Sequence, residues 1–300
     1  MYLYHFGLGE LPFTLTPNTN FYLPMAMHDE ALAVISIALQ TGEGFIKVVG
    51  EVGTGKTLLC RKLLNEIPEH FVTAYIPNPY LNPDELRRAV AVELGIKQAQ
   101  RISAQLLTQR IQTRLLELHS QGHSVVLILD EAQALPEDSL EALRLFTNLE
   151  TETRKLLQVV LFAQPELDER LAKTEFRQLR QRITFGYKLR VMNAHEVQQY
   201  IHHRLEVAGY KGVELFPVKT CQKIARVSQG VPRLVNVLCH KMLMLAYGQG
   251  HYKMTNTLLK AAVEDTESIE PTSKRSLFIV LSFGVLSVLS LVYYALLVKL

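Results

Sequence analysis

Cysteine is scarce in this 300-residue chain, and its cysteines form no motif. Cys60, Cys221 and Cys239 share no C-x-x-C spacing and leave an odd number, so neither a disulfide framework nor a zinc site is indicated. The ten histidines include His202 and His203, but adjacent helical positions point in different directions, and no acidic or cysteine partner lies at ligand spacing. The sequence therefore favours a reducing compartment.

An excess of charge of one sign is also missing. The 32 Lys and Arg residues nearly balance the 29 Asp and Glu residues, which leaves a net charge of +3. This balance does not call for a nucleic-acid partner. The N-terminal stretch "MYLYHFGLGELPF" has neither a basic nor a long apolar region, so we expect no signal peptide, and the sequence contains no internal repeat.

One long apolar run is present near the C-terminus. Residues 277–298 carry no charge, and as a helix with a rise of about 1.5 Å per residue they would cover a hydrocarbon core of roughly 30 Å. A buried core helix is the alternative, but such helices are usually shorter and have a polar face. We therefore predict a transmembrane helix at 277–298, after a short polar linker at 267–276.

Short apolar runs alternate with helical patterns in the first two thirds of the chain, which is typical of an α/β fold with a parallel sheet. We expect five strands, at 45–50, 71–76, 124–130, 156–163 and 183–189. Helices are predicted between them, at 28–40, 56–67, 83–93, 102–120, 137–148 and 165–180. Strand signals stop at Asn193, and four more helices are predicted at 194–207, 216–228, 232–247 and 256–266.

The sequence "GEVGTGKT" matches the P-loop pattern G-x-x-x-x-G-K-[ST] between a predicted strand and a predicted helix. Its glycines let the backbone turn its N–H groups toward phosphate oxygens, and the helix N-terminus adds partial positive charge. Lys56 would reach the β- and γ-phosphates of ATP, and the Thr57 hydroxyl would bind Mg²⁺. The predicted nucleotide-binding residues are Gly50, Glu51, Val52, Gly53, Thr54, Gly55, Lys56, Thr57 and Leu58.

A second motif, "SVVLILDEAQ", places Asp130 and Glu131 at the carboxyl end of a buried strand, where ligands bind in open α/β sheets. Asp130 would hold the water shell of Mg²⁺, and Glu131 would act as general base toward the attacking water. Two adjacent acids at a strand end can also cap a helix, and only the P-loop makes the catalytic interpretation the better one. The 74 positions from Lys56 to Asp130 leave room for an inserted strand, unlike nucleotide kinases or GTPases.

Three further features resemble the AAA+ family. The strand "LLQVVLFA" is followed directly by Gln164, at the position of the AAA+ sensor-1 residue. Three arginines lie before the fifth strand: Arg177, Arg180 and Arg182. AAA+ proteins carry at this place an arginine finger that reaches the neighbouring subunit, and Arg182 and Arg180 are the leading candidates for it. The alternative is that these arginines form a basic surface stripe. In "SQGVPRLVN", Arg233 follows a helix-starting proline, like a sensor-2 arginine. The resemblance implies catalytic roles for these residues in an oligomer.

The stretches "YHFGLGELPFTLTPNTNFYLP", "LRLFTNLET" and "AQPELDERL" resemble the general secretion pathway protein A (ExeA-like) family over about residues 1–265. That resemblance implies a homo-oligomeric ATPase on the cytoplasmic face of a bacterial inner membrane, acting with pilus or secretion assembly proteins. Because the chain ends after its apolar run, it looks like the short members that support MSHA-type (type IV) pilus biogenesis. The implied units are an arm contacting the nucleotide (1–27), the P-loop core (28–191) and a helical lid (192–266).

Two alternatives remain open at this point. The P-loop, the "DEAQ" strand end and the helical lid also occur in DNA-handling ATPases of the transposition-accessory kind, although the near-neutral charge and the apolar run argue against one. The other alternative is a nucleotide-gated scaffold that binds ATP and barely hydrolyses it. The presence of Glu131 and Gln164 argues against this alternative.

Overall fold

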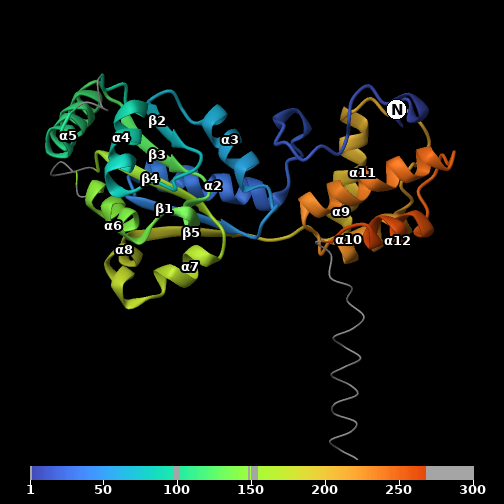
Figure 1. Ribbon diagram of the computed structural model, residues 1–300. Helices are drawn as coiled ribbons and strands as arrows, with labels where there is room; N and C mark the ends of the chain where they lie inside the picture. The colour runs from blue at the N-terminus through green and yellow to red at the C-terminus, as the bar shows by residue number, and fades with distance from the viewer. Residues whose placement is uncertain (1, 98–101, 148, 150–154, 268–300) are drawn as a thin grey trace, which may run out of the picture.

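The computed structural model describes residues 2–97, 102–147, 149 and 155–267. Its centre is a five-stranded, all-parallel sheet in the order β2-β3-β4-β1-β5 (Figure 1). The strands are β1 (Phe45–Gly50), β2 (Phe71–Ile76), β3 (Ser124–Leu129), β4 (Leu157–Ala163) and β5 (Ile183–Leu189). The predicted five-stranded α/β architecture is therefore confirmed.

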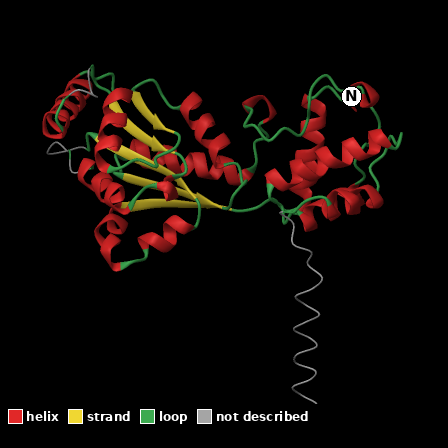
Figure 2. Ribbon diagram, in the orientation of Figure 1, coloured by secondary structure: helices red, strands yellow, loops and turns green. Residues whose placement is uncertain are grey.

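Helices cover both faces of this sheet and form the whole of a second, helical part (Figure 2). The helices that accompany the sheet are α2 (Ala26–Gln40), α3 (Lys56–Glu66), α4 (Pro83–Glu93), α5 (Ala104–Ser120), α6 (Glu137–Phe146), α7 (Glu166–Leu171) and α8 (Arg177–Arg182). The helical part contains α9 (Ala194–Val207), α10 (Val218–Val227), α11 (Pro232–Gly248) and α12 (Asn256–Glu264). Short 3-10 turns are η1 (Thr19–Phe21), η2 (Ala132–Ala134) and η3 (Thr174–Phe176).

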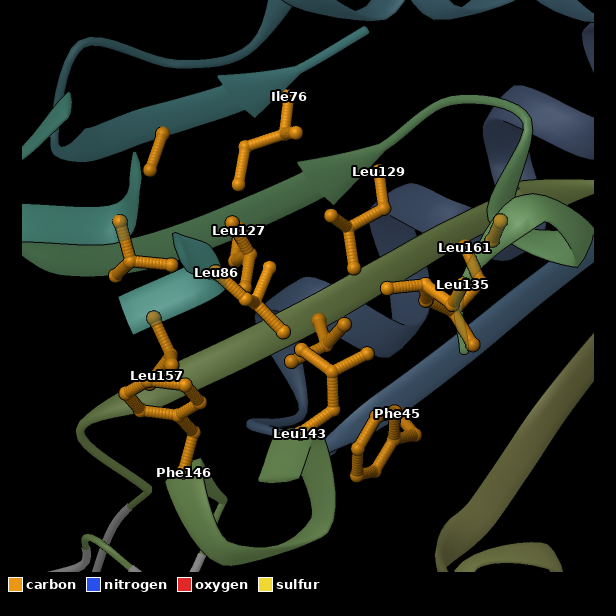
Figure 3. Packing of buried hydrophobic residues seen from close by; sticks show 14 of the residues in the cluster. Phe45, Ile76, Leu86, Leu127, Leu129, Leu135, Leu143, Phe146, Leu157 and Leu161 are labelled. Carbon is orange, nitrogen blue, oxygen red and sulfur yellow. The ribbon is translucent and has the colours of Figure 1, made fainter. Parts of the chain in front are cut away.

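The inner strands β1, β3 and β4 are buried along almost their whole length because helices cover both faces of the sheet, whereas the edge strand β5 exposes every second residue. Successive side chains alternate between two cores: Phe45 faces the core shared with α4, α5 and α6, whereas Ile46 faces the core shared with α2 and α3. Figure 3 shows the first core, in which Leu127 and Leu129 of β3 pack with Leu143 of α6. This packing holds the carboxyl ends of the strands in fixed positions.

The N-terminal segment packs on the helical part rather than on the sheet (Figure 1). A short helix, α1 (Tyr2–Phe6), lies against α11, and the Tyr2 hydroxyl is 3.0 Å from Nδ1 of His240. Phe13 and Phe21, farther along the segment, are buried in the same hydrophobic core as the lid helices α9 to α12. We call residues 2–25 the arm, and the arm and the lid share one core.

The predicted helix at 165–180 is wrong in one respect, because the structure divides this segment into α7, η3 and α8. The buried residues explain the break. Leu167 and Leu171 are four positions apart, as one helix face requires, but the next buried residue is Phe176. An extended backbone at Lys173 brings Phe176 back to the core. Two short elements of the arm, α1 and η1, were not predicted from the sequence.

Within the part of the chain that the structure describes, no helix combines the length and the apolar character that a bilayer crossing needs. The predicted transmembrane helix at 277–298 lies outside the described residues, and so does the predicted linker, apart from Glu267.

Candidate active site

Three neighbouring strands bring the predicted site residues to one edge of the sheet. Because β4 lies between β3 and β1, the segments that follow these strands emerge side by side. Lys56 follows β1 after the P-loop, Asp130 and Glu131 follow β3, and Gln164 follows β4. The arrangement is the one expected for ligand binding at the carboxyl ends of a parallel sheet.

The P-loop backbone requires glycine at two positions. Gly53 and Gly55 have φ values of 80° and 97°, which side chains rarely tolerate. A Cβ atom on Gly53 would also lie 2.6 Å from Cβ of Arg233, so the lid approaches the loop too closely for any side chain there. The buried Thr54 closes the loop, since its hydroxyl donates to the Glu51 carbonyl oxygen at 2.8 Å. The result is a narrow cradle of backbone at the start of α3.

Lys56 is buried and anchored across the loop. Its Nζ donates to the carbonyl oxygens of Gly50 at 2.8 Å and Glu51 at 2.9 Å, and only 4% of the residue is exposed. Burial lowers the pKa of this ammonium group, while the nearby carboxylates of Glu131 and Asp130 act in the opposite direction. Buried positive charge at this position suits a strongly anionic ligand such as a triphosphate.

Asp130 lies behind the cradle, with 2% of its surface exposed. Burial raises the pKa of its carboxyl group, although hydrogen bonds from the Thr57 hydroxyl and the Glu131 backbone N–H act to lower it. No cluster of three or more His, Cys, Asp or Glu residues that would hold a metal ion occurs in the described ranges. Two oxygen ligands, Thr57 and Asp130, fit a hard cation that also takes oxygen atoms from phosphate and water, as Mg²⁺ does.

Glu131 is held by two amide side chains. Its Oε2 accepts from Nε2 of Gln164 at 2.9 Å and from Nε2 of Gln133 at 2.5 Å. Gln133 also joins the other strand end, because its Oε1 accepts from the backbone N–H of Gln164 at 3.0 Å. Burial would raise the pKa of Glu131, but the hydrogen bonds from Gln164 and Gln133 and the charge of Lys56 outweigh it, so the pKa is lowered. The side chain is thus an oriented, ionised carboxylate beside Lys56.

The lid contacts the P-loop through the first turn of α11. The backbone N–H of Arg233 donates to the carbonyl oxygen of Gly53 at 3.3 Å. The Arg233 side chain is exposed and lines the same cleft as Lys56 and Glu131. Its position at the helix start, after Pro232, is the one the sequence predicts, and it places an exposed cation in the same cleft as the cradle.

The three arginines before β5 lie away from this cleft and differ in their partners. Nη1 of Arg182 donates to the Thr147 hydroxyl at 3.0 Å within the chain, and the residue is half-buried. Arg177 and Arg180 are exposed on α8. Of the two leading candidates for an arginine finger, Arg180 is therefore the one whose side chain is free to reach another subunit.

The cleft runs from the P-loop to the arm and the lid. Of the nine predicted nucleotide-binding residues, those from Val52 to Leu58 line it, whereas Gly50 and Glu51 lie behind Lys56. Its other walls are formed by the arm, α2, α9 and α11, through residues that include Thr14, Tyr22, His28, Tyr200, Arg204 and Asn236. His28 is buried against Gly55, and its burial lowers the pKa of the imidazole.

Sequence reasoning missed three polar residues of the site: Gln133, Arg204 and Asn236. Gln133 stands within the quoted "DEAQ", so its position next to the acidic pair was a signal. Arg204 and Asn236 lie on the buried faces of α9 and α11, among apolar residues. A charged or amide residue on the apolar face of a predicted helix was the signal for these two.

Comparison with known proteins identifies a domain family and a long relative. A family model described as "AAA domain" matches residues 39–171. General secretion pathway protein A of Aeromonas hydrophila is 39% identical to the chain over 288 residues, which is 95% of this chain and 52% of that protein. The chain thus spans about half the length of this curated relative.

Two solved structures illustrate the similarity in fold. The Aeropyrum pernix ORC2 protein, solved as ADPNP–ADP complexes, has a TM-score of 0.63 and 20% identity, with 86% of this chain and 74% of that chain covered. Cdc6p from Pyrobaculum aerophilum has a TM-score of 0.63 and 18% identity, with 85% and 70% covered. At these identities the likeness shows the fold alone. Residues 39–171 therefore match an AAA domain, and the P-loop core and the lid together share the fold of these two structures.

Proposed function

Because this chain is an ATPase with an AAA domain, we propose that it hydrolyses Mg-ATP in the cleft between the P-loop and the lid, to support assembly of a secretion or type IV pilus machine. The observation that carries the catalytic part is the hydrogen bond of 2.9 Å between Glu131 and Gln164, at adjacent strand ends beside Lys56. A carboxylate held in this way can accept a proton from water.

Binding in this proposal rests on the cradle and its cation. The backbone from Gly53 to Thr57 would surround the phosphate groups, and Lys56 would neutralise their charge at the buried end of the cleft. Thr57 and Asp130 would hold Mg²⁺, which supplies charge neutralisation on the phosphate oxygens when it is bound. The oxygen donors of these two residues support this assignment.

Catalysis in this proposal rests on Glu131, Gln164 and Arg233. Glu131 would take the proton of the attacking water, and Gln164 would fix the direction of the carboxylate through its Nε2. Arg233 would add positive charge from the lid, because its side chain lines the cleft beside Gly53. Arg180, on the exposed face of α8, would serve the site of a neighbouring copy in a homo-oligomer, with Arg182 as the second choice.

The cellular role rests on the relative. The 39% identity to general secretion pathway protein A extends over 95% of this chain, which supports a secretion-related role. We further propose that residues 277–298 anchor the chain in the inner membrane, with the ATPase in the cytoplasm. We also propose that the chain is an ATPase of the MSHA pilus biogenesis (MshM) type. The sequence supports the anchor through its uncharged run. The divisions 1–27, 28–191 and 192–266 remain the proposed domain boundaries.

A DNA-handling role has less support. The structures with the same fold that are described as bound to DNA, such as the Aeropyrum pernix ORC1 protein, are 19% identical to this chain and show only the fold. The net charge of +3 does not provide the basic excess that contact with many phosphates usually needs.

The decisive experiment is Mg²⁺-dependent ATP turnover by the purified full chain. We expect Lys56→Ala to abolish nucleotide binding, and Glu131→Gln to keep binding while lowering kcat by roughly a hundredfold or more. Lys223→Ala and Glu206→Gln change the same residue types at exposed lid positions and serve as matched controls that should leave turnover unchanged. Unchanged turnover in both site variants would exclude the proposal.

The oligomer is tested separately by the dependence of turnover on protein concentration. If Arg180 acts on a neighbouring site, activity per chain rises as the wild-type protein assembles, and Arg180→Ala removes this rise without weakening ATP binding. Arg182→Ala is the comparison, and a larger loss there would reverse the choice between the two arginines. Turnover per chain that is constant at all concentrations would contradict an arginine finger.

A further inference from the structure

The turn η2, which follows β3, is tied to helix α7, which follows β4. Nη1 of Arg170 on α7 donates a hydrogen bond to the main-chain carbonyl oxygen of Gln133, the middle residue of the turn, at 2.8 Å. The helix that carries Arg170 is fixed in turn by Leu167 and Leu171, which are buried in the sheet core with α4, α5 and α6. Arg170 thus connects the turn to a rigid part of the molecule.

Arg170 binds a carbonyl oxygen that the turn itself does not use. The turn closes through main-chain hydrogen bonds to the carbonyl oxygens of Glu131 at 2.8 Å and Ala132 at 3.3 Å, and neither bond involves the carbonyl of Gln133. A guanidinium is a planar and permanently charged donor, and its hydrogen bonds are stronger than those between neutral groups. The hydrogen bond from Arg170 therefore adds an external hold on a turn that has only two internal ones.

The held residue, Gln133, is also the one that contacts the catalytic carboxylate. Its side-chain Nε2 donates to Oε2 of Glu131 at 2.5 Å, and its Oε1 accepts from the backbone N–H of Gln164 at 3.0 Å. Both side-chain contacts need the main chain of Gln133 to stay in place, because a displaced backbone carries the amide away with it. Gln164 and Arg170 thus hold this residue from the same β4–α7 segment, one through its side chain and the other through its main chain.

The charge of Arg170 does not act on the catalytic carboxylate directly. Burial acts to raise the pKa of Glu131, while hydrogen bonds from Gln164 and Gln133 and the charge of Lys56 lower it, and Arg170 is not among these causes. Arg170 is also not among the residues that line the nucleotide cleft. Any influence of Arg170 on the reaction therefore passes through the position of Gln133.

We propose that Arg170 is a positioning residue for ATP hydrolysis: it holds the main chain of Gln133, so that the Gln133 amide keeps the Glu131 carboxylate directed at the attacking water. This inference rests on the proposed function, because Glu131 is the general base there. A displacement of about 1 Å that originates away from the reacting atoms can lower a rate by up to about a hundredfold. The loss of Arg170 should therefore slow the chemical step and leave nucleotide binding intact.

The first test measures kcat and KM for ATP with the purified full chain in the presence of Mg²⁺. Arg170→Met keeps the apolar stem of the side chain and removes its donors. We expect it to lower kcat by roughly tenfold and to leave KM within about twofold of the wild type. Arg170→Lys keeps a charged donor, so its kcat should lie between those of the wild type and Arg170→Met. Arg110→Met, at an exposed position of α5, is the matched control and should change neither constant.

The second test combines Arg170→Met with Gln133→Leu. If Arg170 acts through Gln133, the double variant should have the kcat of Gln133→Leu alone, within about twofold, whereas two independent effects would multiply. Both single variants should also move the acid side of the kcat/KM profile to higher pH, because each loosens the hydrogen bond that keeps Glu131 ionised. A purely structural role of Arg170 predicts neither result. Calorimetric titration with ATP shows that each variant is folded.

The outcomes separate this inference from the proposed function. A wild type whose turnover is unaffected by Glu131→Gln would refute the proposed function itself. With turnover that depends on Glu131, three results would each overturn the role of Arg170 alone: an unchanged kcat in Arg170→Met, effects of Arg170→Met and Gln133→Leu that multiply, or different pH profiles of these two variants. If Arg170→Met does not bind ATP, Arg170→Lys takes its place in the same comparison with Gln133→Leu.

Discussion

Glu131 has a backbone φ of 53°, a left-handed conformation that residues other than glycine rarely adopt. Such strain persists where the surrounding structure imposes it, and it is frequent at functional sites. Here the turn η2 follows directly, and it brings Gln133 back toward the Glu131 carboxylate. The strained backbone and the hydrogen bond together set the direction of this side chain.

The hydrogen bonds to Glu131 predict a pH effect. Gln133→Leu removes one donor, so we expect the pKa of Glu131 to rise toward its ordinary value. A general base must be ionised, and the acid side of the kcat/KM profile should therefore move to higher pH, by about 0.5–1 unit. Turnover measured over a pH range that begins well below the ordinary glutamate pKa of about 4.3 checks this. Gln178→Leu, exposed on α8, should leave the profile in place.

Some outcomes would speak against that role of Gln133. If Gln133→Leu lowers kcat equally at every pH, the residue positions the Gln164 backbone and does not tune Glu131. A shift to lower pH would contradict the direction of the hydrogen-bond effect altogether.

For single residues, the sequence predicted the position in the site where the residue directly follows a strand. Asp130 and Gln164 come immediately after apolar runs, so their place at the sheet edge could be predicted from the runs alone. Gln133 and Arg204 could not be placed in this way. The contacts of Gln133 depend on the turn at η2, and those of Arg204 on an arm nearly two hundred positions earlier in the chain.

The connection between the sheet and the lid is held by one glycine. The backbone N–H of Met192, which follows β5, donates to the carbonyl oxygen of Gly230 before α11 at 3.0 Å. Gly230 has a φ of 72°, and a Cβ atom there would lie 1.9 Å from the Met192 carbonyl oxygen. No side chain fits unless the two segments separate.

Gly230→Ala should therefore destabilise the lid, by about 3 kcal/mol or more, through backbone strain and overlap. Gly248 provides the comparison, because it lies in α11, its φ is not positive, and no atom lies within 4 Å of the place that a Cβ atom would occupy. Gly248→Ala should raise stability by up to about 1 kcal/mol through its helix propensity. Urea denaturation measures the free energy of unfolding of both variants, provided that the dependence of this free energy on urea concentration is unchanged. Equal effects of the two substitutions would refute the close approach at Met192.

Element prediction succeeded where periodicity was regular. The inner parallel strands β3 and β4 are buried on both faces and read as continuous apolar runs, and all five strands were placed to within one residue. The break near Lys173 was not visible, because a polar stretch between two buried residues fits either one long helix or two short ones. Helix α1 was missed since five residues form too short a pattern, and its stability comes from α11.

The arm joins the two parts of the molecule across the cleft. Its first residues share the core of the lid, as Phe6 and Phe13 do, while Pro17 accepts a hydrogen bond of 2.8 Å from Nη1 of Arg61 on the P-loop helix. The lid itself reaches the loop through Arg233. The chain therefore has sheet cores and a lid core that meet at the site, and the arm belongs to the lid core.

The three free cysteines report on these cores separately. Cys60 lies in the sheet core against α2, whereas Cys221 and Cys239 lie in the lid core, and all three are buried. Burial raises the pKa of each thiol, to about 12 for Cys221, so labelling requires local opening that exposes the thiol. Reagent uptake at each cysteine thus measures the opening of its own core.

Phe6→Ala removes a buried arm side chain from the lid core and should cost about 3 kcal/mol of lid stability. We expect labelling of Cys221 and Cys239 to accelerate by roughly a hundredfold, while labelling of Cys60 stays unchanged. Ile35→Ala in the sheet core is the reverse control and should accelerate Cys60 alone. Mass spectrometry of labelled peptides assigns each rate. Equal acceleration of all three cysteines by Phe6→Ala would mean that the arm, the lid and the sheet open as one unit.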